Sequence, residues 1–368
     1  MTAVVPGTAL VQAPGCGRVL VGFPAVRRRA SIGTMTTSVS RNDFADLARR
    51  VSDAGLTDRR PGYYVLRFAL VAAGYLGAWC GVVALGDSWW QIAVAAFLAV
   101  VSGQVALLAH DVAHRQVFRG RRASMIAGRI LGNLGIGMSY SWWMDKHTRH
   151  HANPNHAERD PDVEPELLVW SPDQARASSG LTRWFGRYQA WLFFPALLLE
   201  GFYLHYAGFR ACLDRDTRGR GTEATLLIAH VLLYVALVFG VLPFGKAVVF
   251  VLAHQMLWGL YMGATFAPNH KGMPMRSGDE PEDFLRRQVL TSRNISGGRL
   301  VDIAYGGLNH QIEHHLFPAM PSANLRRAQP IVAAYCAEID VPYLRTGLVD
   351  SYVRTVRSLH EAGAPLRG

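Results

Sequence analysis

The sequence predicts an all-α integral membrane protein, with four transmembrane helices in two hairpins, additional interfacial helices and a cytoplasmic helical cap that carries a histidine-rich metal site. Three observations support this fold class. Of the 368 residues, 50% are hydrophobic and only 18% are charged. The hydrophobic residues gather in runs of about 20, the length that a helix needs to cross a bilayer. Short histidine motifs lie at the ends of these runs or in the polar chain beyond them.

The first predicted hairpin consists of the apolar runs 63–85 and 89–108, which are separated only by Gly86, Asp87 and Ser88. Its turn contains no Lys or Arg. Its open ends carry a group of arginines: Arg59, Arg60, Arg115, Arg119, Arg121 and Arg122. Because basic residues accumulate in cytoplasmic loops, we expect these open ends, with His110 and His114, on the cytoplasmic side.

The second predicted hairpin consists of the runs 224–242 and 247–266, which turn at Pro243, Phe244 and Gly245 with Lys246 alone nearby. Basic residues again lie at the open ends: Arg210, Arg215, Arg218, Arg220, Lys271 and Arg276. Both turns are therefore expected to face away from the cytoplasm. The polar chain from Lys271 onward is expected to form the cytoplasmic cap.

Two further apolar stretches, 124–144 and 184–209, are predicted to lie in the membrane interface instead of crossing the bilayer. The ligands of one metal site must share one side of the bilayer, so an even number of crossings must separate successive histidine motifs. The second stretch is also rich in Trp and Tyr, contains the acidic Glu200 and is interrupted by Pro195. These features suit a helix that lies in the interface.

Residues 1–42 contain no Asp or Glu but five arginines, a composition that also occurs in transit peptides. A simpler interpretation is an upstream extension caused by a misplaced start, with Met35 as the alternative first residue. In either case we expect this segment to be disordered and residues 43–368 to form the membrane domain.

Three motifs bring possible metal ligands together. His110 and His114 are four residues apart, whereas His147, His150 and His151 share a spacing with Gln311, His314 and His315. At these spacings the side chains leave one face of a helix within a single turn. Imidazole binds iron, zinc, copper and nickel, so the motifs predict a metal site without selecting the metal.

The order of these motifs resembles the membrane-bound fatty acid desaturases, most closely the bacterial acyl desaturases related to front-end, delta-6-like enzymes. Further tracts similar to this family are His-His-Ala-Asn-Pro-Asn-His at 150–156, Asp-Pro-Asp at 160–162, Ala-Pro-Asn-His-Lys-Gly at 267–272 and Gln-Val-Leu-Thr-Ser-Arg-Asn at 288–294. The resemblance extends from about residue 43 to the C-terminus. It implies an enzyme that introduces a cis double bond into a fatty acyl chain, with two iron ions as cofactor and O2 as co-substrate.

The resemblance also implies the ligand set of the di-iron centre. It comprises Gln311 and eight histidines: His110, His114, His147, His150, His151, His270, His314 and His315. His270 is included because the family has a histidine at the cytoplasmic end of this span; on spacing alone it could equally be a helix-end cap. Gln311 replaces the commoner histidine, a substitution typical of front-end desaturases.

Four neighbours of these ligands are candidates for supporting roles. Asp111 and Glu313 could accept hydrogen bonds from ligand N–H groups, and Asn269 could orient a metal-bound water. His310 points about 100° away from Gln311 around a helix, which suits an indirect or structural role. The acidic run Asp160, Asp162, Glu164 and Glu166 could brace ligands, but we expect it to face water. The remaining histidines are interpreted as structural: His156, His205, His230, His254 and His360.

The expected partners are a lipid bilayer, a fatty acyl substrate linked to coenzyme A or to a lipid, and a separate electron donor. The sequence contains no His-Pro-Gly-Gly haem signature. Its four cysteines are far apart and do not have the spacing of an iron–sulfur cluster site. A ferredoxin or a flavin-dependent reductase is therefore expected. The net charge of +11 is explained by basic cytoplasmic loops without nucleic acid, and the resemblance suggests a bacterial inner membrane.

Alternatives remain open at this point. A carotenoid or sterol hydroxylase or ketolase could use the same histidine architecture. Residues 310–314 also match His-x2-Glu-His, the inverted motif of zinc peptidases, although that interpretation leaves the first two motifs without a role. A membrane haem protein or metal carrier would instead have its histidines near the bilayer centre.

Overall fold

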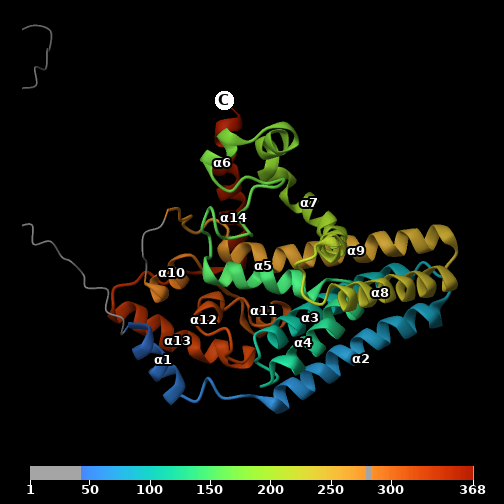
Figure 1. Ribbon diagram of the computed structural model, residues 1–368, viewed down its shortest axis with the longest axis horizontal. Helices are drawn as coiled ribbons and strands as arrows, with labels where there is room; N and C mark the ends of the chain where they lie inside the picture. Colours follow the sequence, from blue (N-terminus) through green and yellow to red (C-terminus); the bar gives the residue numbers. More distant parts are fainter. Residues whose placement is uncertain (1–42, 279–282, 368) are drawn as a thin grey trace, which may run out of the picture. The chain divides into compact units, whose positions relative to one another are not determined.

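The computed structural model describes residues 43–278 and 283–367 (Figure 1). The predicted extension at 1–42, with its alternative start at Met35, lies outside these residues. Within them the chain is mostly helical. The β-structure consists of two short parallel strands, β1 (Asn294–Ser296) and β2 (Arg345–Gly347).

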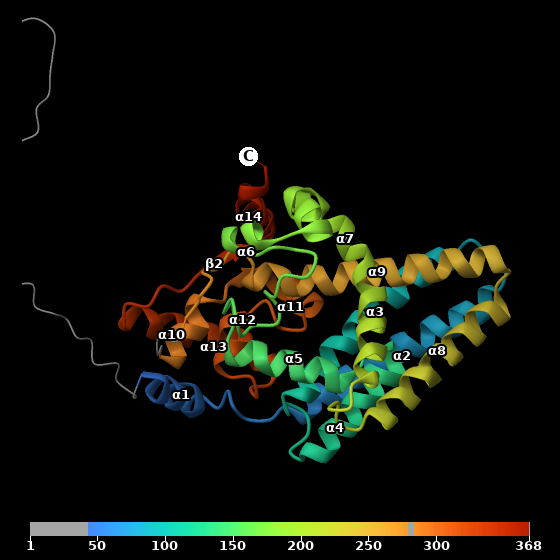
Figure 2. The same ribbon diagram turned by 45° about the horizontal axis from the view of Figure 1, so that its top comes forward.

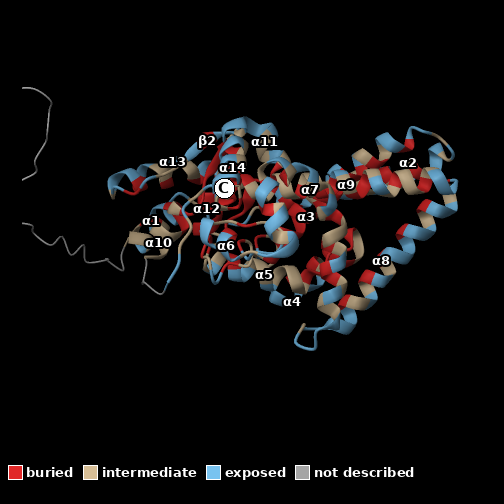
Figure 3. Ribbon diagram, turned by 90° about the horizontal axis from the view of Figure 1, so that it is seen from above, coloured by how far each residue is buried: buried red, intermediate tan, exposed pale blue. Residues whose placement is uncertain are grey.

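Four long helices form a bundle: α2 (Pro61–Leu85), α3 (Gln91–Ala113), α8 (Arg220–Val241) and α9 (Phe244–His270). They run side by side as two hairpins whose turns lie at the same end (Figures 1 and 2). Lys246 Nζ joins these turns through a 2.5 Å ion pair with Asp87 Oδ1. Side chains between the helices form a packed core that includes Val82, Leu98 and Phe250, while the outer faces of α2 and α8 are largely exposed (Figure 3). The two predicted helical hairpins are therefore present.

A fifth helix, α7 (Gly180–Leu213), is also long and apolar enough to cross a membrane, so the described residues contain five candidates. It continues through Pro195 over 34 residues. α7 runs across α9 instead of alongside it (Figure 2). The two backbones meet at Gly201 and Gly259, where a Cβ atom would lie 2.3 to 2.4 Å from the other helix. Only glycine permits this crossing.

The apolar stretch 124–144 does not form one continuous helix. It is divided into α4 (Arg121–Arg129), a π-helix η1 (Ile130–Gly135) and, after a short loop, α5 (Tyr140–Ala152). None of these pieces reaches the ~20 residues of a transmembrane helix. This division is consistent with the expectation that the stretch does not cross the bilayer as a single helix.

The cap is built mainly from the C-terminal part of the chain. It contains α1 (Asp43–Asp53), α10 (Phe284–Leu290), α12 (Gln311–Leu316) and α13 (Ser322–Glu338), which share a core around Leu47, Val289, Ile312 and Val332. The short α11 (Gly298–Ala304) also belongs to this part of the chain but has no buried residue. The short α6 (Pro172–Ala177), α14 (Leu348–Ala362) and the 3₁₀-helix η2 (Ala364–Leu366) lie beside the N-terminal half of α7 (Figure 1). α12 is buried at the junction of cap and bundle.

Candidate metal centre

The predicted ligands lie where the bundle meets the cap. His110 is in the last turn of α3, His114 directly follows that helix, and His270 is the last residue of α9. The other histidines come from α5 and α12. Two span ends and two short helices thus bring all eight predicted histidines, and Gln311, to one buried region.

The first group contains five histidines whose ring nitrogens lie within 4.8 Å of one another: His110, His114, His147, His151 and His314. The Nε2 atom of His147 is 2.8 Å from that of His114 and 3.0 Å from that of His151. The Nε2 atoms of His151 and His314 are 3.1 Å apart. We call these residues the five-histidine group.

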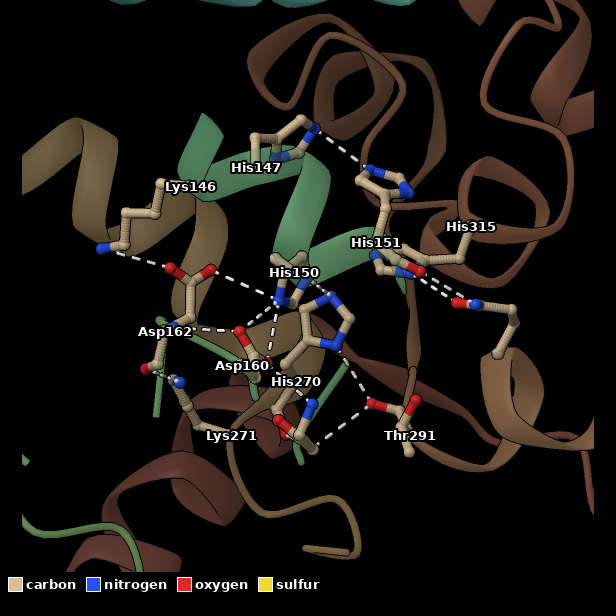
Figure 4. A network of polar contacts seen from close by, with 12 residues as sticks. Lys146, His147, His150, His151, Asp160, Asp162, His270, Lys271, Thr291 and His315 are labelled. Atoms are coloured by element: carbon tan, nitrogen blue, oxygen red, sulfur yellow. Dashed lines mark hydrogen bonds and ion pairs between the residues drawn. The ribbon is translucent and has the colours of Figure 1, made fainter. Parts of the chain in front are cut away.

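The second group contains His150, His270 and His315 (Figure 4). The Nε2 atoms of His150 and His270 are 3.3 Å apart, and the side-chain amide nitrogen of Gln311 is 3.0 Å from His270 Nε2. His270 and Gln311 thus lie beside His150, with the Gln311 amide nitrogen facing His270. We call these four residues the braced group, because their outer contacts hold the rings as described next.

Each histidine of the braced group has an acceptor at Nδ1, on the side away from the others. His150 Nδ1 is 3.0 Å from both carboxylate oxygens of Asp160, and His270 Nδ1 donates to the Thr291 carbonyl at 3.0 Å (Figure 4). His315 Nδ1 is 2.9 Å from the Gln288 side-chain oxygen. Acceptors of this kind fix the tautomer and orient the ring of a metal-binding histidine.

Histidines that are adjacent in the sequence belong to different groups. His150 belongs to the braced group and His151 to the five-histidine group, and the adjacent His314 and His315 divide in the same way. The rings of His151 and His315 stack with centroids 4.3 Å apart. The histidines therefore form two neighbouring groups, each of which could hold a metal ion.

The nitrogen positions fit metal ions. Two nitrogens bound at about 2.1 Å to one metal are roughly 3.0 Å apart when they subtend a right angle. In the braced group the Nε2 atoms of His150 and His270 face each other, on the side opposite the Nδ1 contacts. His110 has both ring nitrogens buried without a hydrogen-bond partner among the described residues.

Burial also keeps most of these imidazoles neutral. It lowers the pKa well below the usual value, with neighbouring imidazoles adding to the effect, for His147, His151, His314 and His315. Neutral imidazole is the form that binds metal. Burial acts in the same direction on His150, but the carboxylates of Asp160 and Asp162 outweigh it and raise the pKa of that ring.

The two predicted carboxylate acceptors have their hydrogen bonds with other residues. Asp111 forms a 2.5 Å ion pair with Arg67 and accepts from Ser322, while its other oxygen is 3.6 Å from His110 Nδ1. Glu313 accepts from Asn294 Nδ2 at 2.7 Å and from Tyr343 OH at 2.6 Å. Burial raises the pKa of Glu313 to about 7.

These contacts tie Asp111 to the junction of α2, α3 and the cap, and Glu313 to the interior of the cap. In an inverted-motif zinc peptidase, Glu313 would have to reach a metal-bound water, and its hydrogen bonds do not point it there.

The other two supporting candidates have different surroundings. Asn269 is fully buried, and its Nδ2 atom donates to the Gln311 side-chain oxygen at 3.3 Å and to the Leu308 carbonyl at 3.2 Å. His310 Nε2 lies 3.1 Å from Asp302. Asn269 is thus in contact with a predicted ligand, whereas His310 faces the cap.

Four further supporting residues lie outside the predicted set. Asp160 was expected to face water, but it is 2% exposed and holds His150 together with the backbone N–H of Asn155. Gln288 and Thr291 lie in a tract that resembles the family, yet sequence spacing gives no contact between them and His315 or His270. Trp143 stacks on His147 with ring centroids 4.4 Å apart. The Asp-Pro-Asp tract directly after the second motif was the one available signal for Asp160.

Helices that can cross a membrane and a buried, two-part histidine centre at their ends define a membrane protein with a candidate metal site. Comparison with known proteins extends this description: the sequence profile of the fatty acid desaturase family matches residues 87–347. The chain belongs to the fatty acid desaturase family. This membership confirms the resemblance seen in the histidine motifs and the prediction of a desaturase enzyme.

Curated relatives agree with the family. The acyl-lipid (9-3)-desaturase of Physcomitrium patens is 29% identical over 279 residues, which cover 73% of this chain and 53% of that protein. Fatty acid desaturase 3 of Bos taurus is 29% identical over 356 residues, covering 94% and 78% of the two chains. A delta(6)-fatty-acid desaturase of Caenorhabditis elegans is 26% identical over 335 residues, covering 86% and 74%. The chain thus spans about half of the Physcomitrium protein and about three quarters of the other two.

Proposed function

We propose that this protein is an O2-dependent fatty acyl desaturase that introduces a cis double bond into an acyl chain at a histidine-ligated di-iron centre, and that residues 43–368 form its single membrane domain. The observation that carries the proposal is the pair of adjacent histidine groups at the junction of bundle and cap. Family membership selects the chemistry among the reactions that such a centre could support.

The five-histidine group would hold one iron, and the braced group with Gln311 would hold the other. Bound iron would supply the activated oxygen needed to remove hydrogen from an unactivated methylene, which side chains cannot do. The chain itself buries the ligands, holds the rings of His150, His270 and His315 at Nδ1, and excludes water with the cap. Trp143, stacked on His147, forms part of the wall beside the five-histidine group.

We infer four membrane spans, α2, α3, α8 and α9, with the metal site on the cytoplasmic side. The course of α7 across α9 supports an interfacial position for this helix (Figure 2). So do its exposed aromatic side chains, since Trp184 is 56% and Trp191 is 81% exposed. The expectation of a bacterial cell membrane rests on the family resemblance, and the cytoplasmic side rests on the arginines at the open ends of the hairpins.

The substrate would be an acyl chain carried by coenzyme A or by a lipid, and the electrons would come from a separate ferredoxin or flavin-dependent reductase. A groove of about 1470 Å³ lies between α5 and α7, with both charged and apolar walls that include Trp142, Lys146, Phe193 and Arg210. Its mixed lining suits the polar head and the first carbons of such a substrate.

The proposal is tested by producing the full chain in a host that lacks desaturases and locating new double bonds by mass spectrometry. Iron content of the purified protein is measured in parallel. We expect close to two irons per chain and a new cis-unsaturated fatty acid. Hydroxylated carotenoid or sterol without unsaturated fatty acid, or a protein loaded with iron that forms no double bond with any donor, would contradict it.

A further inference from the structure

The N-terminus of α5 is held by side chains from two other elements. The first N–H groups of a helix have no partner within the helix. In α5, Ser139 accepts from Trp142 N at 3.3 Å, Asn133 Oδ1 of the π-helix accepts from Tyr140 N at 3.1 Å, and Glu223 of α8 accepts from Ser141 N at 3.3 Å. The helix that carries three predicted ligands is thus capped largely from outside itself.

Glu223 is the centre of this arrangement. Its side chain is fully buried, and besides Ser141 N it accepts from Arg129 Nε at 2.6 Å and Asn133 Nδ2 at 2.6 Å. It also accepts from the hydroxyls of Ser139 at 2.9 Å and Ser141 at 3.0 Å. Every side chain that caps α5 is therefore either Glu223 or a hydrogen-bond donor to it. A carboxylate at a helix N-terminus also interacts favourably with the helix dipole.

The backbone before α5 cannot by itself fix the position of that helix. It consists of a π-helix, whose hydrogen bonding is rarely stable over more than one turn, followed by a short loop. His147 follows Tyr140 by seven residues, about 10 Å along a stiff helix. A rotation or shift at the N-terminus therefore displaces His147, His150 and His151 together.

We propose that Glu223 is a positioning residue, which sets the rotation and axial position of α5 and so places His147, His150 and His151 in register with the histidines of α3, α9 and α12. This inference rests on the proposed function, because its consequence is metal placement. Within the described residues Glu223 has no hydrogen bond to a predicted ligand, and it acts through Asn133, Ser139 and Ser141.

The test compares Glu223→Gln and Glu223→Ala with Thr225→Ala in the full chain. Thr225 lies on the same helix, and in the part of the chain that the structure describes its hydroxyl bonds only to Gly221 of that helix, so it is the matched control. Three quantities are measured: the visible spectrum of the cobalt(II)-loaded protein, the number of double bonds formed per reductant consumed, and the melting temperature.

We expect Glu223→Ala to change the cobalt(II) spectrum and to lower the yield of double bonds per reductant about tenfold, because displacements near 1 Å can cost that much or more. Glu223→Gln keeps one acceptor oxygen and should lie between Glu223→Ala and the wild type. Thr225→Ala should match the wild type in all three measurements.

A lower melting temperature with an unchanged cobalt(II) spectrum and unchanged yield would assign Glu223 a stabilising role only, and would overturn the proposal. If Glu223→Ala fails to fold, Glu223→Gln and Asn133→Ala decide the question by the same spectrum. An inactive wild-type protein would contradict the proposed function, whereas the cobalt(II) spectra would still test the positioning role.

Discussion

The two histidine groups lie side by side but are held in different ways. In the braced group, His150, His270 and His315 each have an acceptor at Nδ1. In the five-histidine group, buried ring nitrogens of His110, His151 and His314 have no hydrogen-bond partner among the described residues. The first arrangement orients rings by hydrogen bonds, and the second relies on crowding of the rings against one another and on Trp143.

This difference has a physical consequence. A ring with a fixed tautomer presents its lone pair to a metal before the metal arrives, so less ordering accompanies binding. Rings without outer acceptors can rotate or change tautomer when the site is empty. We therefore expect the braced group to bind metal more tightly and the five-histidine group to adjust more between states.

The largest expected effect follows from removing one ligand of each group. His147→Ala and His315→Ala should each lower desaturation by at least about a hundredfold, because loss of a ligand costs more than the 10–100-fold typical of its outer partners. Membrane insertion should be largely unchanged. Double bonds formed in a desaturase-deficient host provide the measurement, and near-normal turnover in either variant would speak against both groups as metal sites.

A smaller effect is expected from Asp160→Asn, which keeps the shape of the side chain but weakens the acceptor at His150. Metal affinity of the braced group should fall about 10–100-fold while that of the five-histidine group stays within about threefold. The two affinities are separated by following metal release to a chelator. Equal losses from both groups would show that the two sites are not braced independently.

The pH dependence of the metal-free protein provides a further test. The folded-state pKa is lowered for His147, His151, His314 and His315, so below about pH 6.5 the unfolded chain binds protons that the folded chain does not. Stability is therefore full above this pH and falls as the pH decreases, by about 1.4 kcal/mol for each unit of lowered pKa. The raised pKa of His150 acts in the opposite sense. Melting temperatures between pH 5 and 8 should fall toward the acidic side, and a flat or rising profile would contradict this.

The smallest effect is expected from Asp162→Asn. Its carboxylate is 3.4 Å from His150 Nδ1, 39% exposed, and paired with Lys146 at 3.2 Å. Being farther from the ring and better solvated than Asp160, it should change metal affinity by less than about threefold. The same chelator assay measures it. A loss as large as that of Asp160→Asn would mean that both carboxylates hold His150 equally.

Much of the fold was predictable because it depends on local pattern. Apolar runs of sufficient length, separated by short turns, predicted both hairpins. A run of about 20 apolar residues can form a membrane helix whatever other helices pack beside it. The one-turn spacings of the histidines likewise gave their convergence. The division of 124–144 into α4, a π-helix and α5 was not predictable, because the π-helix and the loop before α5 depend on contacts with α8.

The spacing of the histidines in the sequence could not predict which candidate ligand belongs to which group. His150 and His151 are adjacent, yet they belong to different histidine groups, and only the relative placement of α3, α5, α9 and α12 decides this division. Asp160 illustrates the same limit: four acidic residues at alternate positions predicted a solvated stretch, but the loop places one of them against His150.

The sequence by itself determined the helices, their hairpins and the identity of the candidate ligands, because helix length, polarity and one-turn spacing are properties of neighbouring residues. The tertiary structure alone decided that the ligands divide into two groups, that one group is braced by Asp160, Thr291 and Gln288, and that Glu223 caps α5. These features join residues from 10 to more than 100 positions apart, and such contacts are set by the packing of whole helices instead of by local pattern.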